Sequence, residues 1–340
     1  MRAAFCSEPG RLELRDVPQP VPGQGEVLLR VRNCGVCGSD LHWYHGEFPI
    51  PPVCPGHEIS AEVAEVGAGV HGLRPGDRVA VEPLIVCREC SYCLTGNYQL
   101  CRKFRLLGTM VDGGFAESLV MPAYALYRLP AELDWELGAL SEPMAVCVHA
   151  VRLGEVRLGA RVLVLGAGTI GLLSAVAARA AGAAEVLVTA RHPHQHAAVE
   201  ALGARPFAAT AEGSAALAEY AREQAIDVVI ETVGGTADTL NEAVQLVRPG
   251  GVVSVLGVFS GPVACSGLLL VVKEVRIVGS LTYGRAGGRA DFEVAVELLA
   301  SQRERLRALI THRFSLAQIA DGFAIAADKR SGAIKVTIAP

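Results

Sequence analysis

The 340-residue sequence lacks three features that would each point to a different class of protein. It has no basic excess, since 31 Lys and Arg stand against 35 Asp and Glu, so no positive field favours nucleic acid or an anionic membrane. Its longest apolar runs, such as GLLSAVAARAAGAA, contain Arg or many small residues and are too short for a membrane span. A secretory signal typically has a basic segment followed by an apolar core. The start of this sequence has no such pattern. We therefore expect a soluble, cytoplasmic protein.

The composition is that of a well-buried globular chain. Hydrophobic residues make up 51% and charged residues 19%, which argues against disorder. The chain is too long for one ordinary core, so two domains are expected. Ten cysteines are present, and in the cytoplasm a cysteine cluster is more often a metal or redox site than a disulfide framework.

Four of the cysteines lie in one short segment, CRECSYCLTGNYQLC, with the spacing C-x2-C-x2-C-x7-C. Thiolates this close can converge on one tetrahedral zinc ion, and four sulfur ligands leave no open position. The pattern therefore predicts a structural zinc site. The alternatives are an iron–sulfur ligand run, which usually has a different last interval, and unrelated thiols. The predicted ligands are Cys87, Cys90, Cys93 and Cys101.

A second set of possible ligands stands upstream of this segment. Cys37 occurs in NCGVCGSDLHWYHG, and His57 and Glu58 follow in CPGHEISAEV. A thiolate, an imidazole and a carboxylate with one open position are typical of a catalytic zinc. Glu142 in LSEPMAV is an acid among apolar residues, and a buried carboxylate needs a cation or hydrogen-bond donors. Each signal is weak alone, and their conjunction predicts a catalytic metal site.

A dinucleotide-binding turn follows the short apolar run Arg161–Leu165. The motif GAGTIG comprises Gly166, Ala167, Gly168, Thr169, Ile170 and Gly171, and an Ala-rich helical segment comes next. The first glycine permits a tight turn, the second lets backbone approach a pyrophosphate, and the third allows close helix–strand packing. A strand, a glycine turn and a helix in this order predict nicotinamide dinucleotide binding.

The next strand, Glu185–Thr189, ends without the acid that binds the ribose 2′-hydroxyl in NAD enzymes. Ala190 leaves room there, Arg191 offers a cationic fork that suits a phosphate, and His192 adds a weaker contact. We therefore predict a preference for NADP(H) over NAD(H). The alternative is that Arg191 is only a solvated surface residue.

The order of these motifs resembles that of the zinc-dependent medium-chain alcohol dehydrogenases, closest to the sorbitol (polyol) and threonine dehydrogenase branch. The resemblance covers essentially the whole chain and includes CGVCGSD, GHE, the four-cysteine segment, GDRVAVEP, DGGFAES, SEPMAV, the glycine motif and THRF. It implies that Cys37 and His57 ligate zinc, that Glu58 is the acidic ligand of the polyol branch, and that Glu142 ligates zinc or holds its water.

The resemblance also implies roles around the metal. Ser39 would contact the substrate hydroxyl, Asp40 would orient His57, and His42 occupies the position of a proton-relay residue, unless it is a solvated loop histidine. The nicotinamide end would be lined by Leu256, Gly257, Val258, Leu281 and Thr282.

The implied fold class is α/β. A doubly wound (Rossmann) parallel-sheet cofactor domain at 148–285 accompanies a β-rich, GroES-like catalytic domain at 1–147, and 286–340 returns to the catalytic domain. Two zinc ions per chain and a homo-oligomer, a dimer or a tetramer, are expected by the same analogy.

The expected activity is zinc-dependent hydride transfer between NADP(H) and a secondary alcohol or ketone. A polyol is the favoured substrate, and L-threonine, sugar acids and aminocyclitols are alternatives. Two other classes are a catalytically silent nucleotide-binding zinc protein and a zinc-free quinone reductase, which would lack both the GHE motif and the cysteine segment.

Overall fold

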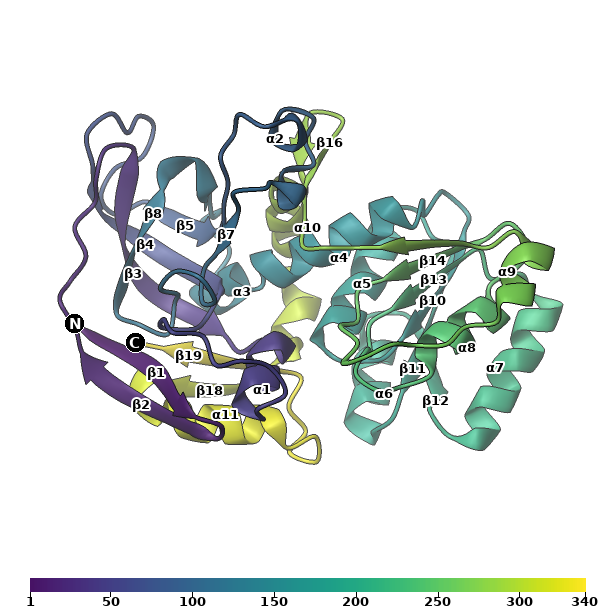
Figure 1. Cartoon of the computed structure of the whole chain (residues 1–340). Helices are drawn as coiled ribbons and strands as arrows, with labels where there is room; N and C mark the ends of the chain where they lie inside the picture. The colour runs from purple at the N-terminus through teal and green to yellow at the C-terminus, as the bar shows by residue number, and fades with distance from the viewer. The chain divides into compact units, whose positions relative to one another are not determined.

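The chain builds one structural unit, leaves it at Glu142 and returns to it at Gly284. The computed structural model describes all residues 1–340 (Figure 1). Unit 1 comprises Met1–Glu142 and Gly284–Pro340, and unit 2 comprises Pro143–Tyr283. The sequence placed these boundaries at 147/148 and 285/286. The first differs because the division lies within a helix, α4 (Ser141–Leu153), where no Gly- or Pro-rich linker marks it.

Unit 1 is built on a seven-stranded sheet in the order β18-β19-β3-β4-β5-β9, with β8 also paired to β3. Small hairpins and short helices surround this sheet. The strands of the sheet are β3 (Glu26–Gly35), β4 (Glu58–Val66), β5 (Arg78–Val81), β8 (Ser118–Pro122), β9 (Leu126–Arg128), β18 (Ile310–Ser315) and β19 (Lys335–Ala339). The smaller strands are β1 (Arg2–Glu8), β2 (Arg11–Asp16), β6 (Leu84–Ile85), β7 (Arg105–Leu106), β16 (Arg285–Ala286) and β17 (Arg289–Ala290). The helices are α1 (Gly38–Tyr44), α2 (Ser91–Leu94), α3 (Trp135–Ala139), α10 (Asp291–Leu306) and α11 (Ile319–Ala327).

The C-terminal segment shares the core of unit 1. Phe323 on α11 is fully buried, and its ring centroid lies 5.4 Å from those of both Trp43 and Phe115. β19 pairs antiparallel with β3 and parallel with β18. Residues from both ends of the chain therefore bury the same apolar surface.

Unit 2 is a six-stranded parallel sheet in the order β12-β11-β10-β13-β14-β15. Its strands are β10 (Arg161–Leu165), β11 (Glu185–Ala190), β12 (Arg205–Ala208), β13 (Val228–Glu231), β14 (Val252–Val255) and β15 (Arg276–Gly279). Its helices are α5 (Thr169–Ala180), α6 (Pro193–Ala201), α7 (Ala211–Glu223), α8 (Thr239–Leu246) and α9 (Gly267–Lys273). In Figure 1, α7, α8 and α9 lie on one face of the sheet and α5 and α6 on the other. The predicted doubly wound sheet with a β-rich companion is confirmed.

The strand order reverses at β10, because β11 and β13 flank it on opposite sides. Ligands of open α/β sheets bind at the carboxyl ends of the strands beside such a reversal. Between β13 and α8, Gly234 and Gly235 both have positive φ, 61° and 63°, and the turn that they form places the start of α8 at Thr239.

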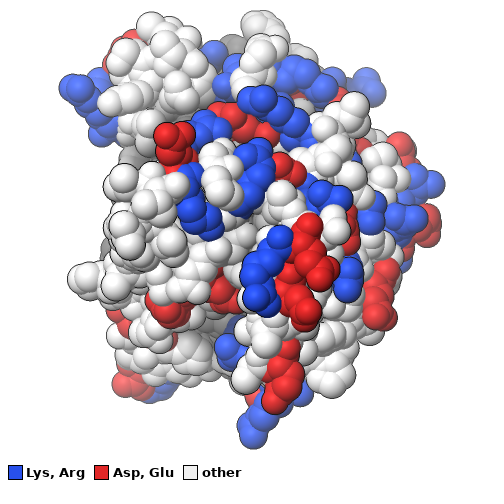
Figure 2. All heavy atoms as spheres, turned by 90° about the vertical axis from the view of Figure 1, so that its right-hand side faces the viewer, with Lys and Arg blue, Asp and Glu red and all other residues white.

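Charges of both signs are interspersed on the face shown in Figure 2, where basic and acidic side chains neighbour one another. No single-sign field covers that face, in agreement with the near balance of 31 basic and 35 acidic residues. None of the helices combines the length and the apolar character needed to cross a membrane.

Candidate catalytic, zinc and cofactor sites

The predicted catalytic ligands meet where β3 and β4 run side by side. Gly35 at the end of β3 pairs with Glu58 at the start of β4, so Cys37 and His57 come from neighbouring chain segments. A Cβ on Gly35 would lie 2.0 Å from Glu58 Oε2, and glycine is therefore required for this close approach. The ligand atoms of Cys37, His57 and Glu58 all lie within 4.8 Å of one another.

Asp40 organises the first two of these residues. Its Oδ2 accepts a hydrogen bond of 2.9 Å from the backbone N–H of Cys37, and its Oδ1 lies 3.8 Å from His57 Nδ1. The other ring nitrogen, His57 Nε2, is 3.5 Å from Ser39 Oγ. The imidazole is thus oriented from one side by a carboxylate and presents Nε2 to the hydroxyl, as expected of a metal-binding histidine. The donor set and its convergence fit a zinc ion.

Electrostatics in this cluster are governed by burial and by close charges. Burial alone would lower the pKa of His57, but the charges of Asp40 and Cys37 outweigh it and raise that pKa well above its ordinary value. Burial raises the pKa of Glu142 to about 7, and the charge of His57 opposes this rise only in part. Glu142 is buried and acts electrostatically on His57, but it is not among the three residues whose ligand atoms converge.

Sequence reasoning missed the partner of Glu58. Lys335 on β19 donates to both carboxylate oxygens, at 2.8 Å to Oε1 and 2.6 Å to Oε2, and also to the carbonyl oxygen of Val36 at 3.0 Å. Both side chains are buried, with relative exposures of 2% and 1%. The one available signal was a lysine within the otherwise apolar strand AIKVTIAP.

His42 lies on α1, and its side-chain contacts are with the segment that follows this helix. Its Nδ1 is 2.5 Å from Glu47 Oε2, and its ring stacks on Phe48 at 4.8 Å between centroids. No hydrogen bond links it to Ser39. The proton-relay role of His42 stays a prediction, and any relay through it leads toward Glu47.

The four cysteines of the second set also converge. Sγ–Sγ distances are 3.8 Å for Cys87–Cys93, 3.6 Å for Cys90–Cys93 and 3.5 Å for Cys87–Cys101. A tetrahedron of sulfurs about 2.3 Å from a central zinc has edges of about 3.8 Å. The cage therefore has the size of a zinc–tetrathiolate site. Hydrogen bonds from the backbone N–H groups of Glu89 and Cys90 lower the pKa of Cys87 to about 6, which favours the thiolate that metal binding needs.

The cysteine lobe is bonded to the segment that returns at Gly284. The N–H of Arg285 donates to the carbonyl of Gly96 at 2.8 Å, and the hydroxyl of Tyr98 donates to the carbonyl of Gly284 at 3.4 Å. No sequence motif predicted these hydrogen bonds between distant chain segments. It gives the lobe a structural role within unit 1.

The glycine turn has the geometry that the motif predicts. Gly166 has φ of 101° and its N–H donates to Thr189 Oγ1 at 2.9 Å, which joins the ends of β10 and β11. A Cβ on Gly171 would lie 1.9 Å from the Gly166 carbonyl oxygen, whereas one on Gly168 would meet nothing within 4 Å. Gly168 caps α5, so open space faces a helix N-terminus, which fits a pyrophosphate. Thr169 and Ile170 form the first turn of this helix.

Arg191 stands out among the nine arginines of unit 2. The other eight each have a hydrogen bond or ion pair, whereas the guanidinium of Arg191 has none. Arg191 is exposed and Ala190 before it is buried at 1%. An unpaired cation therefore lies at the carboxyl end of β11, and a small residue leaves space beside it.

The residues predicted for the nicotinamide end follow two neighbouring strands. Leu256, Gly257 and Val258 come after β14, and Leu281 and Thr282 come after β15. Val258 and Leu281 are 51% and 52% exposed. Both segments therefore lie at the carboxyl edge of the sheet, together with the glycine turn.

Glu231, the last residue of β13, organises this edge. It is fully buried, and its Oε1 accepts hydrogen bonds from the N–H groups of Val233 and Gly234 and from the hydroxyl of Thr239. It thereby holds the loop after β13.

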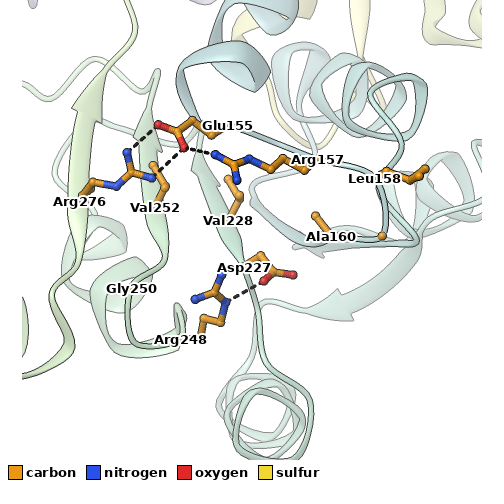
Figure 3. Close-up of a pocket in the computed structure, with 12 residues that line it drawn as sticks. Glu155, Arg157, Leu158, Ala160, Asp227, Val228, Arg248, Gly250, Val252 and Arg276 are labelled. Atoms are coloured by element: carbon orange, nitrogen blue, oxygen red, sulfur yellow. Dashed lines mark hydrogen bonds and ion pairs between the residues drawn. The ribbon is translucent and has the colours of Figure 1, made fainter.

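A separate hollow of about 350 Å³ lies at the opposite, amino edge of this sheet (Figure 3). Glu155 pairs there with Arg276 at 2.6 Å and Arg157 at 3.0 Å, and Asp227 pairs with Arg248 at 2.7 Å. Every charged side chain drawn around it already has a partner. We assign these pairs to the stability of the sheet edge.

Comparison with known proteins agrees with this arrangement. Residues 23–131 match the alcohol dehydrogenase GroES-like domain family, and residues 169–301 match the zinc-binding dehydrogenase family. The sorbitol dehydrogenase of Halalkalibacterium halodurans is 33% identical, over 97% of this chain and 96% of that protein.

Solved structures extend the likeness over the whole fold. A zinc-binding dehydrogenase of Sinorhizobium meliloti bound to NADP has a TM-score of 0.89 at 33% identity, covering 100% of this chain and 99% of the other. Galactitol-1-phosphate dehydrogenase of Escherichia coli has a TM-score of 0.91 at 30% identity, with 100% of both chains covered. The chain belongs to the zinc-containing medium-chain alcohol dehydrogenases, in the sorbitol dehydrogenase branch. Members of this family are oxidoreductases that act on CH–OH groups.

Proposed function

We propose that this protein is a two-zinc, NADP(H)-preferring dehydrogenase of a polyhydroxylated secondary alcohol. The observation that carries the proposal is the convergence of Cys37, His57 and Glu58 within 4.8 Å, beside the hydroxyl of Ser39. Three types of ligand lie where the end of β3 meets the start of β4, next to a hydroxyl that can form a hydrogen bond with a substrate. This combination suits the interconversion of an alcohol and a ketone.

Cys37, His57 and an acidic residue would hold the catalytic zinc, which supplies Lewis-acid polarisation of the substrate oxygen. Ser39 Oγ, 3.5 Å from His57 Nε2, is placed to accept the hydroxyl proton of the substrate and to pass it on. Asp40 keeps the imidazole oriented through Nδ1. The glycine turn would hold the pyrophosphate of the dinucleotide, and the loops after β14 and β15 would lie beside its nicotinamide, the group that would supply the hydride chemistry.

Lys335 bears on which acid completes the zinc shell. Because both oxygens of Glu58 accept from its ammonium group, Glu58 is a weaker anionic ligand than an unpaired carboxylate. We propose that Glu58, although paired with Lys335, would be the acidic residue that holds the metal with Cys37 and His57. Glu142, buried and with a pKa of about 7, then serves to hold a water molecule or a substrate hydroxyl.

The cofactor preference rests on Arg191 and on the absence of an acid at the end of β11. An NAD enzyme places a carboxylate there, which would repel a 2′-phosphate. Here a buried Ala190 and an unpaired guanidinium stand in its place. The NADP bound in the related S. meliloti structure supports the same choice.

A polyol is the substrate class that the relatives favour, since sorbitol and galactitol 1-phosphate appear in their names. Near the site, Glu47 is the one charge in the segment HGEFPIPP, and it is bonded to His42. An acid there disfavours carboxylate substrates, so L-threonine and sugar acids rank lower. Aminocyclitols remain compatible with Glu47.

The test is a substrate panel on zinc-replete enzyme. Sorbitol, xylitol, galactitol, an aminocyclitol, L-threonine and a sugar acid are each assayed with NADP+ and with NAD+, following absorbance of the reduced nicotinamide. We expect the highest kcat/KM for a polyol with NADP+. Turnover of L-threonine alone would contradict the substrate class, and no turnover with any alcohol would favour the catalytically silent alternative.

We also propose that the chain forms a homo-oligomer through the edge of unit 2. β15 pairs only with β14, which leaves its outer backbone groups free. Three residues of the adjoining α9 are exposed, Leu268 at 72%, Val271 at 75% and Val272 at 62%. Because antiparallel pairing of β15 with a second copy is two-fold symmetric, this apolar edge is self-complementary.

A cytoplasmic location stays a prediction.

A further inference from the structure

Two histidines follow Arg191 directly and lie against each other. The rings of His192 and His194 stack with centroids 5.5 Å apart and planes inclined by only 7°. Both side chains are half-buried. They belong to the start of α6, at the carboxyl end of β11, where the proposed 2′-phosphate contact of Arg191 lies.

The backbone that presents this pair is fixed. Gln195 Oε1 accepts hydrogen bonds from the N–H groups of both Arg191 and His192, at 3.0 and 3.1 Å. The guanidinium and the two imidazoles are therefore displayed from one ordered turn. The ring nitrogens of His194 have no hydrogen-bond partner, so they are available to a ligand.

The third histidine of the segment HPHQH is used differently. His196 Nε2 lies 3.1 Å from the carbonyl oxygen of Ala190, so its ring packs back on the strand end. His196 therefore has a backbone partner where His194 has none, and it is a matched control within the same turn.

No acid near His194 stabilises its protonated form. Burial, and then the charge of His192, lower the pKa of His194 from its ordinary value. Of the strands that pack against α6, β11 carries Glu185 and β12 carries Arg205, both at their amino ends, where they pair with each other at 3.9 Å. Glu200 lies near the far end of α6 and is exposed. In the ligand-free protein the neutral form of His194 is therefore favoured.

We propose that His192 and His194 form a proton-linked part of the 2′-phosphate site, so that NADP+ takes up a proton from solvent when it binds and NAD+ does not. The inference rests on the proposed NADP(H) preference, adds His194 to the residues that determine it and gives His192 a proton-linked role in it. Arg191 supplies the permanent charge. The imidazole pair supplies a second charge only when a phosphate dianion is present.

The size of the effect follows from ordinary electrostatics. An opposite charge within about 4–6 Å favours the protonated form of a histidine, by about 1–3 units in pKa, so a phosphate dianion bound beside this pair favours the imidazolium form. At pH 7.5 the 2′-phosphate, with a second pKa near 6, is already a dianion. We therefore expect a net, fractional proton uptake per NADP+ bound at this pH. The affinity for NADP+ should then weaken about five- to tenfold between pH 6.5 and pH 8.5.

The experiment is isothermal titration calorimetry of zinc-loaded, full-length protein with NADP+ and with NAD+. Titrations at pH 7.5 in two buffers of different ionisation enthalpy give the number of protons exchanged. Dissociation constants are also measured from pH 6.5 to pH 8.5. The variants are His194→Gln and His192→Gln, with His196→Gln as the control.

The inference is supported if wild type and H196Q take up protons with NADP+ alone, and if H194Q or H192Q abolishes the uptake and flattens the pH profile. It is overturned if NADP+ binds more tightly than NAD+ without net uptake, an outcome that leaves the cofactor preference intact. Uptake that persists in both H192Q and H194Q also overturns it. Equal binding of the two cofactors would instead refute the preference on which the inference depends.

Discussion

The ammonium group of Lys335 binds both oxygens of Glu58, at 2.8 and 2.6 Å, although 277 positions separate the two residues in the chain. Both groups are buried, so neither can be hydrated if the other is removed. The pair joins the last strand of the chain, β19, to the glutamate of the GHE motif, which is the first residue of β4. The acidic candidate ligand is thus held by the C-terminal segment.

Loss of one partner should be costly. We expect Lys335→Met to lower the free energy of unfolding by about 3–5 kcal/mol, because it leaves a buried, unpaired carboxylate. The double variant Lys335→Met/Glu58→Gln should recover much of that loss. Urea unfolding of zinc-replete protein measures both, and the exposed Lys329→Met is the control. An unfolding midpoint of K335M equal to that of wild type would show that the pair does not hold Glu58.

Disrupting the catalytic zinc site should remove activity, whereas disrupting the four-cysteine site should lower stability. Cys37→Ser should lower turnover at least about a thousandfold, since Lewis-acid assistance is worth several kcal/mol, with little change in Tm. Cys93→Ser should lower Tm by roughly 5 °C or more, because the lobe loses the ion that orders it. Metal analysis should give two zinc ions in wild type and one in each variant. Equal destabilisation by both changes would contradict the proposed division of roles.

Arg191→Asp should reverse the cofactor preference. The change removes a charge-assisted contact of about 1.5–3 kcal/mol and adds repulsion of the 2′-phosphate. The ratio of kcat/KM with NADP+ to that with NAD+ should therefore fall about a hundredfold. Arg222→Asp on α7 makes the same charge change elsewhere in unit 2 and should leave the ratio unaltered. If both variants keep the wild-type ratio, Arg191 is a solvated surface residue.

A buried acid that belongs to neither set of candidate zinc ligands should make stability depend on pH. Burial raises the pKa of Glu82 from 4.5 to about 7, and the hydroxyl of Tyr127, donating to Oε2 at 2.8 Å, opposes the rise. The folded state therefore holds this proton more tightly than the unfolded state does. Ionising this buried carboxyl therefore lowers the free energy of unfolding. This loss of stability is small below pH 4.5, grows as the pH rises toward 7 and is complete above pH 7.

Glu82→Gln should remove this cost. We expect the variant to be more stable than wild type by up to about 3 kcal/mol at pH 8 and nearly equal to it at pH 5. Urea unfolding at pH 5, 6.5 and 8 with saturating zinc measures the difference, with the exposed Glu132→Gln as control. A difference independent of pH would mean that Glu82 does not titrate in this range.

The exposed edge of unit 2 should determine the oligomeric state. Light scattering coupled to size exclusion should give at least twice the 35.7 kDa of one chain. Leu268→Asp/Val271→Asp should shift the protein to monomer, since it buries charges in an apolar contact. Val21→Asp, at a site 81% exposed in unit 1, should not. A wild-type monomer would refute the proposed interface.

Features that depend on residues close in the chain could be predicted from the sequence. The four cysteines of the cage lie within fifteen consecutive residues, Cys87 to Cys101. Their spacing alone was therefore enough to predict that the four sulfur atoms converge. The glycine turn is equally local, because the strand, the turn and the helix are contiguous. The family resemblance correctly placed the chain among zinc-containing alcohol dehydrogenases, since its motifs occur in a fixed order.

Only the tertiary structure decided the features that join distant segments. The Lys335–Glu58 pair, the bond of Arg285 to Gly96 and the unit boundary within α4 depend on which strands become neighbours. The isolation of Arg191 is of the same kind, because a side chain is known to lack a partner only when all its neighbours are placed. Local sequence therefore determined which chemical groups are present and how each motif folds, while long-range packing decided which charges are paired and which are left for a ligand.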